Sequence, residues 1–186
     1  PMYDIEMGFR ELSGIKEVHV VSEKIEVKEL LWIIDWRKIN NRCIKLFNYT
    51  SIKTYSYQKA EIGDTTDIKL SNCRKYIYEF NSSIMKSGLY DSIADKYYLY
   101  KLEANSHLFT SDYLIKSFPG KIYKLEDVSK INFRKLKIKY KGEFINIIVK
   151  NIQLTPKSIQ KKISCNIGTD TDYLIFTKTI TGNKVI

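Results

Sequence analysis

Histidine, cysteine and glycine are scarce in this sequence, and each scarcity argues against a class of site. The 186 residues include 2 histidines, 3 cysteines and 8 glycines. The glycines are scattered and form neither a GxGxxG pattern nor a P-loop, so no phosphate- or dinucleotide-binding loop is predicted. Cys43, Cys73 and Cys165 form no CxxC pair, which argues against a disulfide framework or a zinc site. Unpaired cysteines of this kind favour a reducing, cytoplasmic location.

Long apolar runs are also missing. The longest is Leu30–Leu31–Trp32–Ile33–Ile34, far shorter than the roughly 20 residues that cross a bilayer as a helix. No signal peptide is recognisable, so we expect no membrane partner. Because the first residue is Pro1 and not methionine, we expect the chain to begin inside a longer gene product.

The sequence contains no recognisable catalytic constellation. His19 is flanked by valines, which is typical of a core or edge-strand histidine. His107 could act as an acid or base, but a histidine that organises its loop is the favoured interpretation, and the adjacent Ser106 does not make a catalytic triad. Asp170 and Asp172 fit a turn with capping aspartates better than a metal site. We therefore predict no catalytic, cofactor-binding or metal-binding residue in this chain.

Charge is distributed unevenly along the chain. Residues 1–113 carry 16 Lys/Arg and 16 Asp/Glu, whereas residues 114–186 carry 15 and 5, which accounts for the whole net charge of +10. Such asymmetry favours a module that binds a polyanion, although a lysine-rich solvated surface is the alternative. Lys157 and Lys161 are one helical turn apart, and lysines of this kind give affinity for phosphates without base specificity. The predicted nucleic-acid-binding residues are Lys121, Arg134, Lys135, Lys137, Lys139, Lys150, Lys157, Lys161 and Lys162.

Residue patterns in the first half predict a mixture of helices and strands. We expect helices at residues 4–13, 24–35 and 82–97, the first capped by Asp4 and the third interrupted by a Gly88 that a close packing partner would explain. We expect strands at residues 18–21, 42–49 and 51–58, and a linker at 59–72. Residues 103–120 are predicted to form a loop with a short helical turn capped by Ser111 or Asp112.

From residue 121 the patterns predict a compact α+β module. Strands are expected at residues 122–125, 144–149, 172–179 and 184–186. Thr155–Pro156 is typical of a helix start, and this helix is expected to reach Ile163. Asn132 could cap a helix at 133–140, but the alternation of Leu136, Ile138 and Tyr140 also fits a strand.

Several runs resemble one protein family. Asn105–Asp112, then Phe118–Pro119–Gly120, resembles a run in class I S-adenosylmethionine-dependent methyltransferases with a C-terminal THUMP-like domain, a family found largely in Bacteroidetes-type bacteria. Further likenesses, in chain order, are Pro1–Ile5, Glu17–Ser22, Glu26–Leu31, Tyr76–Asn81 with Ile84–Gly88, and Asp172–Thr177 with Lys184–Ile186.

The resemblance implies a fold, a cofactor and a partner. The implied parts are the C-terminal end of a Rossmann-like methyltransferase sheet (1–58), a small ferredoxin-like module (73–120) and a THUMP-like domain (121–186). The family's cofactor-binding glycine motif lies upstream of the segment matched by Pro1–Ile5, its aspartate-proline-alanine-arginine motif is absent, and Phe80 replaces its usual proline. S-adenosylmethionine is therefore expected in the full-length enzyme and not on this chain alone. RNA, either tRNA or rRNA, is the expected partner by analogy with true THUMP domains. The alternatives are a stand-alone nucleic-acid-binding or adaptor protein and an interaction module with solvated lysines.

Overall fold

The computed structural model describes the chain except residues 1–2, 25, 38–42, 50–52, 59–67 and 169–170. In this described part the chain is a mixed α/β protein with three sheets. It divides into two compact units, each assembled from separate stretches of sequence. The first unit contains residues 1–68, 79–99 and 115–121, and the second contains residues 69–78, 100–114 and 122–186.

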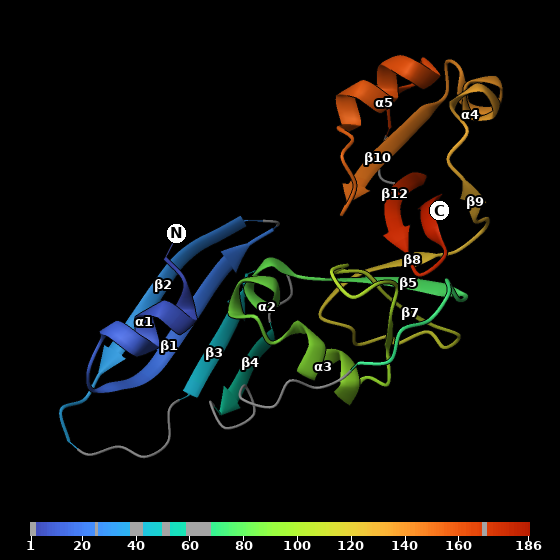
Figure 1. Cartoon of the computed structure of the whole chain (residues 1–186). Coiled ribbons are helices and arrows are strands. Elements are labelled where there is room, and N and C mark those ends of the chain that lie inside the picture. Colours follow the sequence, from blue (N-terminus) through green and yellow to red (C-terminus); the bar gives the residue numbers. More distant parts are fainter. Residues whose placement is uncertain (1–2, 25, 38–42, 50–52, 59–67, 169–170) are drawn as a thin grey trace. The chain divides into compact units, whose positions relative to one another are not determined.

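The N-terminal sheet belongs to the first unit and has the strand order β2-β1-β3-β4 (Figure 1). Its strands are β1 (Ile15–Glu23), β2 (Glu26–Ile34), β3 (Cys43–Asn48) and β4 (Lys53–Gln58). The central strand β1 is antiparallel to β2 and parallel to β3, and β4 is antiparallel to β3. Val18 and Val20 of β1 are fully buried, as expected for a strand with a neighbour on each side.

Helix α1 (Ile5–Glu11) begins where the sequence predicts. The Asp4 carboxylate accepts a hydrogen bond from the Met7 backbone N–H at 2.9 Å, which satisfies one of the free donors of the first turn. Phe9 is buried and lies edge-to-face with Trp32 of β2, with ring centroids 5.9 Å apart. The apolar face of α1 therefore packs on the side of β2 that carries Trp32.

The predicted helix at residues 24–35 is wrong, because this segment forms strand β2. It pairs antiparallel with β1 from Ile15 opposite Ile34 to Glu23 opposite Glu26, with register shifts between Ile15 and Glu17 and between Val21 and Ser22. The run Leu30–Ile34 is apolar on both faces, so its spacing satisfies a helical pattern as well as a strand pattern. Hydrogen bonds between β2 and the central strand β1 stabilise the strand conformation. This pairing is a tertiary effect that cannot be predicted from the local spacing of apolar residues.

The predicted helix at residues 82–97 is two helices, α2 (Ser82–Ser87) and α3 (Tyr90–Lys96). Gly88 separates them in the left-handed conformation, with φ of 76°. An added Cβ would meet no atom within 4 Å, so the expected close packing partner is absent at this glycine. Its role is conformational, because the left-handed backbone region raises the free energy of a residue with a Cβ but not that of glycine.

The middle sheet has the strand order β6-β7-β5-β8. Its strands are β5 (Tyr76–Phe80), β6 (Tyr100–Lys101), β7 (Phe109–Ser111) and β8 (Gly120–Lys124). The helical turn predicted within residues 103–120 is wrong, since this stretch holds β7 and no helix. Ser111 belongs to β7, and its hydroxyl accepts from the Tyr113 backbone N–H at 3.2 Å and so forms a local turn.

The C-terminal sheet lies in the second unit and has the strand order β11-β10-β12-β13-β9. Its strands are β9 (Ser129–Lys130), β10 (Phe144–Lys150), β11 (Asn166–Ile167), β12 (Tyr173–Thr179) and β13 (Gly182–Val185). β10 is parallel to β11 and β12, whereas β13 is antiparallel to β12 and β9. The strands expected at 144–149, 172–179 and 184–186 are thus confirmed to within a residue or two.

Helices α4 (Phe133–Tyr140) and α5 (Pro156–Ile163) lie side by side in the second unit (Figure 1). Residues 133–140 therefore form the helix and not the alternative strand. The Asn132 side chain accepts from the Lys135 backbone N–H at 3.1 Å, and the Thr155 hydroxyl accepts from the Ser158 backbone N–H at 3.2 Å. Both helix starts are those that capping residues in the sequence predict.

Strand β12 contributes to two hydrophobic cores in the second unit. Leu174 and Phe176 join a core that includes Leu136 of α4 and Ile159 of α5. Ile175 faces the other way and packs in a second core with residues of the middle sheet. Period-two alternation therefore places successive apolar side chains in different cores, which explains why this strand is apolar on both faces.

Candidate nucleic-acid interface

Helix α5 separates its apolar and cationic residues onto opposite faces. Ile159 and Ile163 are fully buried, whereas Lys157, Lys161 and Lys162 are exposed. The burial of the two isoleucines fixes the rotation of the helix, so its lysines must face solvent.

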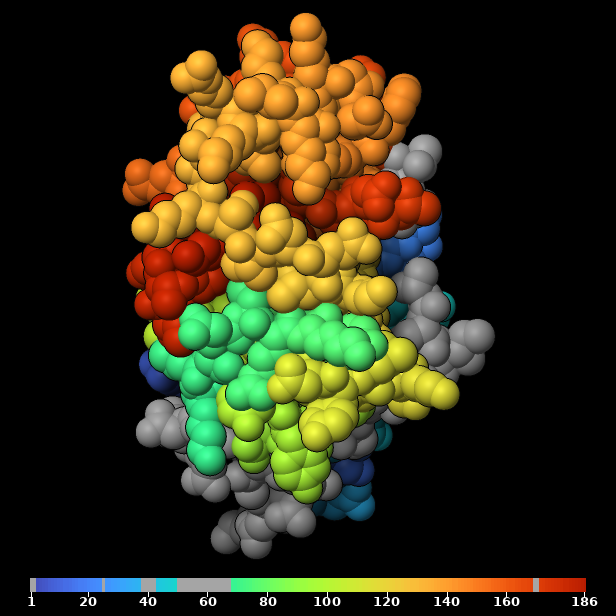
Figure 2. Space-filling model, turned by 90° about the vertical axis from the view of Figure 1, so that its right-hand side faces the viewer, coloured from blue at the N-terminus to red at the C-terminus, as the bar shows by residue number. Residues whose placement is uncertain are grey.

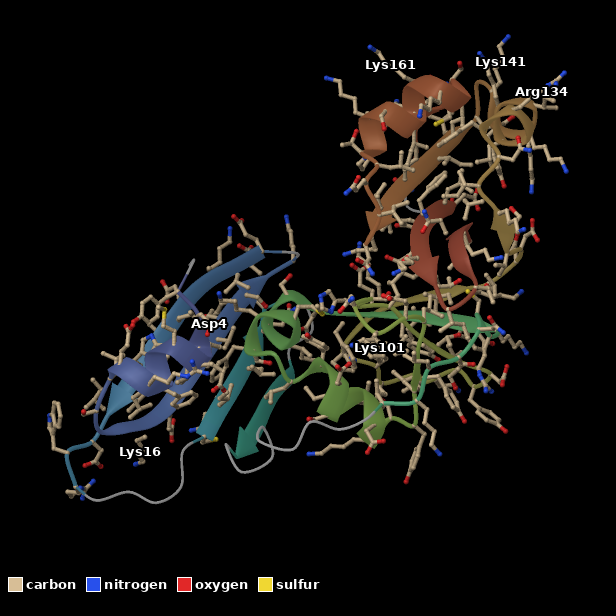
Figure 3. The ribbon with its side chains drawn as sticks, in the orientation of Figure 1. Asp4, Lys16, Lys101, Arg134, Lys141 and Lys161 are labelled. Carbon is tan, nitrogen blue, oxygen red and sulfur yellow. The ribbon has the colours of Figure 1, made fainter. Side chains whose placement is uncertain are left out.

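Helix α4 presents a second set of cations. Arg134 and Lys137 are exposed, and Lys141 directly follows the helix, while Leu136 is buried on the opposite side. Figure 3 shows the side chains of Arg134, Lys141 and Lys161 pointing away from the strands. Together these residues make a surface that we call the α4–α5 cationic surface. Its members are Arg134, Lys137, Lys141, Lys157, Lys161 and Lys162.

Neither helix carries a carboxylate, since their sequences are FRKLKIKY and PKSIQKKI. Lys162 leans toward α4, with its Nζ 4.6 Å from the centroid of the Phe133 ring. An ammonium over an aromatic face is attracted to that ring, so this contact joins the two helices and holds Lys162 at their junction. Five cations of this surface on the two helices, together with Lys141 directly after α4 and without an acid on either helix, create a positive field that favours phosphates.

Other predicted residues lie elsewhere. Lys135 and Lys139 line a cavity of about 430 Å³ beside β9 and β13. Lys139 lies 5.0 Å from the Tyr140 ring centroid, and a hydrogen bond with Tyr140 raises the pKa of its ammonium. Lys150 is half-buried at the end of β10, and Lys121 is exposed on β8 within the first unit. The structure therefore brings together five of the nine predicted cations, and Lys141 joins them.

The candidate acid–base groups belong to different compact units, and His19 and Ser106 each make contacts within their own unit. His19 Nε2 lies 2.7 Å from Glu17 Oε2 on β1, and Lys45 Nζ lies 2.8 Å from the same oxygen. Lys45 first and His19 second hold the pKa of Glu17 below its ordinary value. His107 is exposed, while the buried Ser106 hydroxyl accepts from the Leu108 backbone N–H at 3.1 Å. These contacts order a sheet face and a loop, and they do not assemble a nucleophile with a base.

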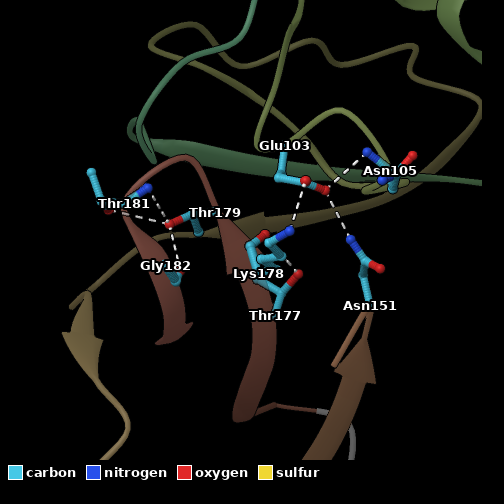
Figure 4. A network of polar contacts seen from close by, with 8 residues as sticks. All are labelled: Glu103, Asn105, Asn151, Thr177, Lys178, Thr179, Thr181 and Gly182. Carbon is cyan, nitrogen blue, oxygen red and sulfur yellow. Dashed lines mark hydrogen bonds and ion pairs between the residues drawn. The ribbon is translucent and has the colours of Figure 1, made fainter. Parts of the chain in front are cut away.

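Glu103 organises the start of the 103–120 stretch, as Figure 4 shows. Its carboxylate accepts from the Asn105 backbone N–H at 2.9 Å, from Asn151 Nδ2 at 2.9 Å and from Lys178 Nζ at 3.1 Å. The Asn105 N–H, then Lys178, hold the pKa of Glu103 below its ordinary value. This carboxylate therefore ties the loop to β12 and to the residue that follows β10.

The described part of the chain contains neither a metal-binding cluster nor a membrane-spanning helix. No three His, Cys, Asp or Glu residues there lie close enough to hold a metal ion. None of its helices is long and apolar enough to cross a membrane. Asp170 lies outside the described residues, so the predicted aspartate turn is described only from Thr171 onward.

A cavity of about 630 Å³ in the second unit was not predicted from the sequence. Tyr123 and Tyr173 both line it, and their rings meet edge-to-face with centroids 5.1 Å apart. The chain contains 14 tyrosines, so composition alone does not single out the two that line this cavity. Only the packing of the middle sheet near β12 brings this pair together.

The chain is similar both to a known family model and to a solved structure. Residues 76–119 match the family model of a ferredoxin-like domain, which confirms the expected ferredoxin-like fold in the middle of the chain. The whole chain is similar in structure to a protein from Porphyromonas gingivalis W83 described as a "putative methyltransferase", with a TM-score of 0.84 and 26% sequence identity. The likeness covers 100% of this chain and 48% of that protein, so the chain spans about half the length of its relative. No curated protein matches the sequence.

Proposed function

We propose that this chain is the RNA-binding, C-terminal portion of a class I S-adenosylmethionine-dependent methyltransferase that acts in the cytoplasm. The observation that carries the proposal is the structural likeness over the full length of the chain to the Porphyromonas gingivalis protein. The likeness to only 48% of that protein supports a division of labour, in which methyl transfer is carried largely by sequence outside this chain.

The proposal assigns a role to each part of the chain. Residues 1–58 form the end of a Rossmann-like sheet, and residues 73–120 form a ferredoxin-like connecting module. Residues 59–67 of the linker expected at 59–72 lie outside the described residues. Residues 121–186 form a THUMP-like domain that binds tRNA or rRNA. The mixed N-terminal sheet, the match over 76–119 and the α+β arrangement of the C-terminal sheet support this assignment.

The RNA partner is supported by the α4–α5 cationic surface. Lysine and arginine side chains on two adjacent helices can follow a phosphate backbone, and each neutralised phosphate releases a counterion. Such contacts position an RNA without reading its sequence. The surface thus supplies affinity and orientation, while the methylated atom is selected by other groups.

RNA binding is tested by fluorescence anisotropy with labelled tRNA and an rRNA fragment across a salt series. The charge reversal Lys157→Glu with Lys161→Glu should weaken binding at least about tenfold and lower the salt slope by about 1.5 to 2. The matched control, Lys69→Glu with Lys116→Glu, reverses two exposed lysines that belong to neither helix and should bind as the parent does. Undetectable binding of the parent at low salt would overturn the RNA proposal.

The location of the cofactor site is tested by titration calorimetry with S-adenosylmethionine. We expect no heat of binding with the 186-residue chain and clear binding with the complete gene product. Tight binding by this chain alone would contradict the proposed division of labour.

The second candidate is a stand-alone nucleic-acid-binding or adaptor protein. It is favoured by one observation, namely that all six residues of the α4–α5 cationic surface lie in the second unit. An assay with tritiated S-adenosylmethionine and bound RNA separates the two candidates. Methyl transfer by the complete gene product supports the first, and RNA binding without transfer supports the second.

A further inference from the structure

The 630 Å³ cavity of the second unit has the dimensions of a small-molecule site, which typically encloses about 300–1,000 Å³. Residues 122–127 line one side, and residues 171–175 with Ile186 line another. Figure 2 shows this hollow between the yellow segment that follows β8 and the orange helix α4, with the red C-terminal strands at its floor.

Apolar and aromatic residues form the interior. Ile77, Leu174 and Ile175 are buried, and Tyr123 and Tyr173 are half-buried beside them. The two tyrosine rings are inclined at 67° with centroids 5.1 Å apart. Both rings pack in part against the buried core that contains Ile77 and Ile175, and both line the cavity, so a planar ligand would stack on the ring surface that lines it.

Charged residues form the mouth. Every charged residue that lines the cavity is exposed, and both signs are present. These residues are Lys124, Glu126, Asp127, Lys139, Glu143 and Asp172. An apolar interior alone would fit structural packing, whereas aromatic side chains beside four carboxylates and two lysines fit a ligand that is aromatic and carries hydrogen-bond donors at its edge, with the two lysines available for an anionic group.

We infer that this cavity binds a single unpaired guanine nucleotide of the bound RNA. The tyrosines stack on the base, as aromatic side chains do with unpaired bases in RNA complexes. Carboxylates accept hydrogen bonds and do not donate them when ionised, so they suit the adjacent N1–H and N2–H₂ donors of guanine better than the edge of uracil. The ammonium groups of Lys124 and Lys139 attract the phosphate of the nucleotide.

Lys139 connects the cavity to the α4–α5 cationic surface. It lines the cavity, and it belongs to the same helix as Arg134 and Lys137. An RNA backbone that follows the outer face of α4 therefore passes within reach of the cavity mouth. The inference rests on the proposed RNA function for its ligand, but the nucleotide site is separate from the phosphate-binding surface and can fail independently.

The experiment measures mononucleotide binding by NMR chemical-shift titration and RNA binding by anisotropy on the same proteins. GMP should bind with shifts at Tyr123, Tyr173 and Leu174, and more tightly than UMP. Tyr173→Leu should weaken GMP and RNA about 5- to 150-fold, the range of one lost base stack. Asp172→Asn, an exposed change that leaves the core intact, should reduce the preference for GMP over UMP.

The outcomes separate the inference from the proposed function. Lys157→Glu with Lys161→Glu should weaken RNA binding at least about tenfold and leave GMP binding unchanged. If GMP shows no shifts at 10 mM, or binds Tyr173→Leu and Asp172→Asn as well as the parent, the inference is overturned while RNA binding by the helices stands. If GMP binds and RNA does not, the proposed function and the RNA origin of the nucleotide are both overturned, and the cavity is a site for free guanine nucleotides.

Discussion

Glu103 and Lys178 are 75 positions apart in the sequence, and their side chains form an ion pair with 3.1 Å between Oε1 and Nζ. The Glu103 side chain is 13% exposed and that of Lys178 is 48% exposed, so the carboxylate is the better shielded partner. Because the same carboxylate also accepts from the Asn105 N–H and from Asn151, its charged form is stabilised at three points. The ion pair therefore forms only when the loop after β6 is packed against β12.

Replacement of Glu103 by glutamine should make the stability of the protein less dependent on pH. The folded pKa of Glu103 is depressed, so its contribution to stability is fully present above the unfolded pKa and is lost as pH falls through the folded pKa. Urea unfolding should show that Glu103→Gln is less stable than the parent at pH 7 and that the difference shrinks on acidification below about pH 4. The control Glu126→Gln, an exposed residue, should follow the parent, and an undiminished difference at low pH would contradict the explanation.

Arg134→Gln and Lys139→Gln should separate the two candidate sites on one helix. Arg134 lies on the outer face of α4, so its loss should weaken RNA by about the value of one phosphate contact and lower the salt slope by about 0.7 to 0.9. Lys139 lines the cavity, so its loss should weaken GMP as well. Anisotropy measures the RNA affinity of both variants, and NMR titration measures their GMP affinity. If both substitutions lowered GMP affinity equally, the cavity and the outer face of α4 would not be distinct sites.

Gly88→Ala should destabilise the protein by about 1–2 kcal/mol, because the left-handed backbone there disfavours a Cβ. No atom obstructs the added Cβ, so the cost is conformational only. Gly88→Asn should recover part of the loss, since asparagine tolerates this region better than alanine. Denaturant midpoints of the three proteins test the order Gly, Asn, Ala, and a different order would indicate a packing role instead.

Ile159→Ala and Ile138→Ala form a matched pair on adjacent helices. Ile159 is fully buried, so truncation should cost about 2–5 kcal/mol through lost burial and a residual cavity. Ile138 is 80% exposed, so the same truncation should change stability by no more than about 0.5 kcal/mol. Urea unfolding provides the comparison, and similar losses at both positions would contradict the orientation of α4.

Local signals in the sequence predict much of the second unit. Asn132 and Thr155 mark the helix starts, and the apolar runs around Ile148 and Ile175 mark the central strands, because capping and burial act over a few residues. The face of α5 that carries Lys157 also follows from the spacing of its buried isoleucines. These features were predictable since each depends on neighbours in the sequence.

Features that depend on distant residues were not predictable. β2 is a strand because it pairs with β1, although Leu30–Ile34 satisfies either period. The contact between Tyr123 and Tyr173 joins residues of the middle and C-terminal sheets. The hydrogen bonds of Glu103 with Asn151 and Lys178 also join segments that are distant in the sequence. Lys139 was predicted as part of one basic group, and only the rotation of α4 assigns it to the cavity.

The position of β12 between two cores has a consequence for how the second unit opens. Leu174 and Phe176 serve one core and Ile175 the other, so neither core can separate from this strand without exposing apolar surface of its own. Local fluctuations are therefore expected to leave β12 intact, and the amides of Ile175 and Phe176 should exchange with solvent only when the whole unit unfolds. Their hydrogen-exchange rates would then measure the global free energy of unfolding of this half of the protein.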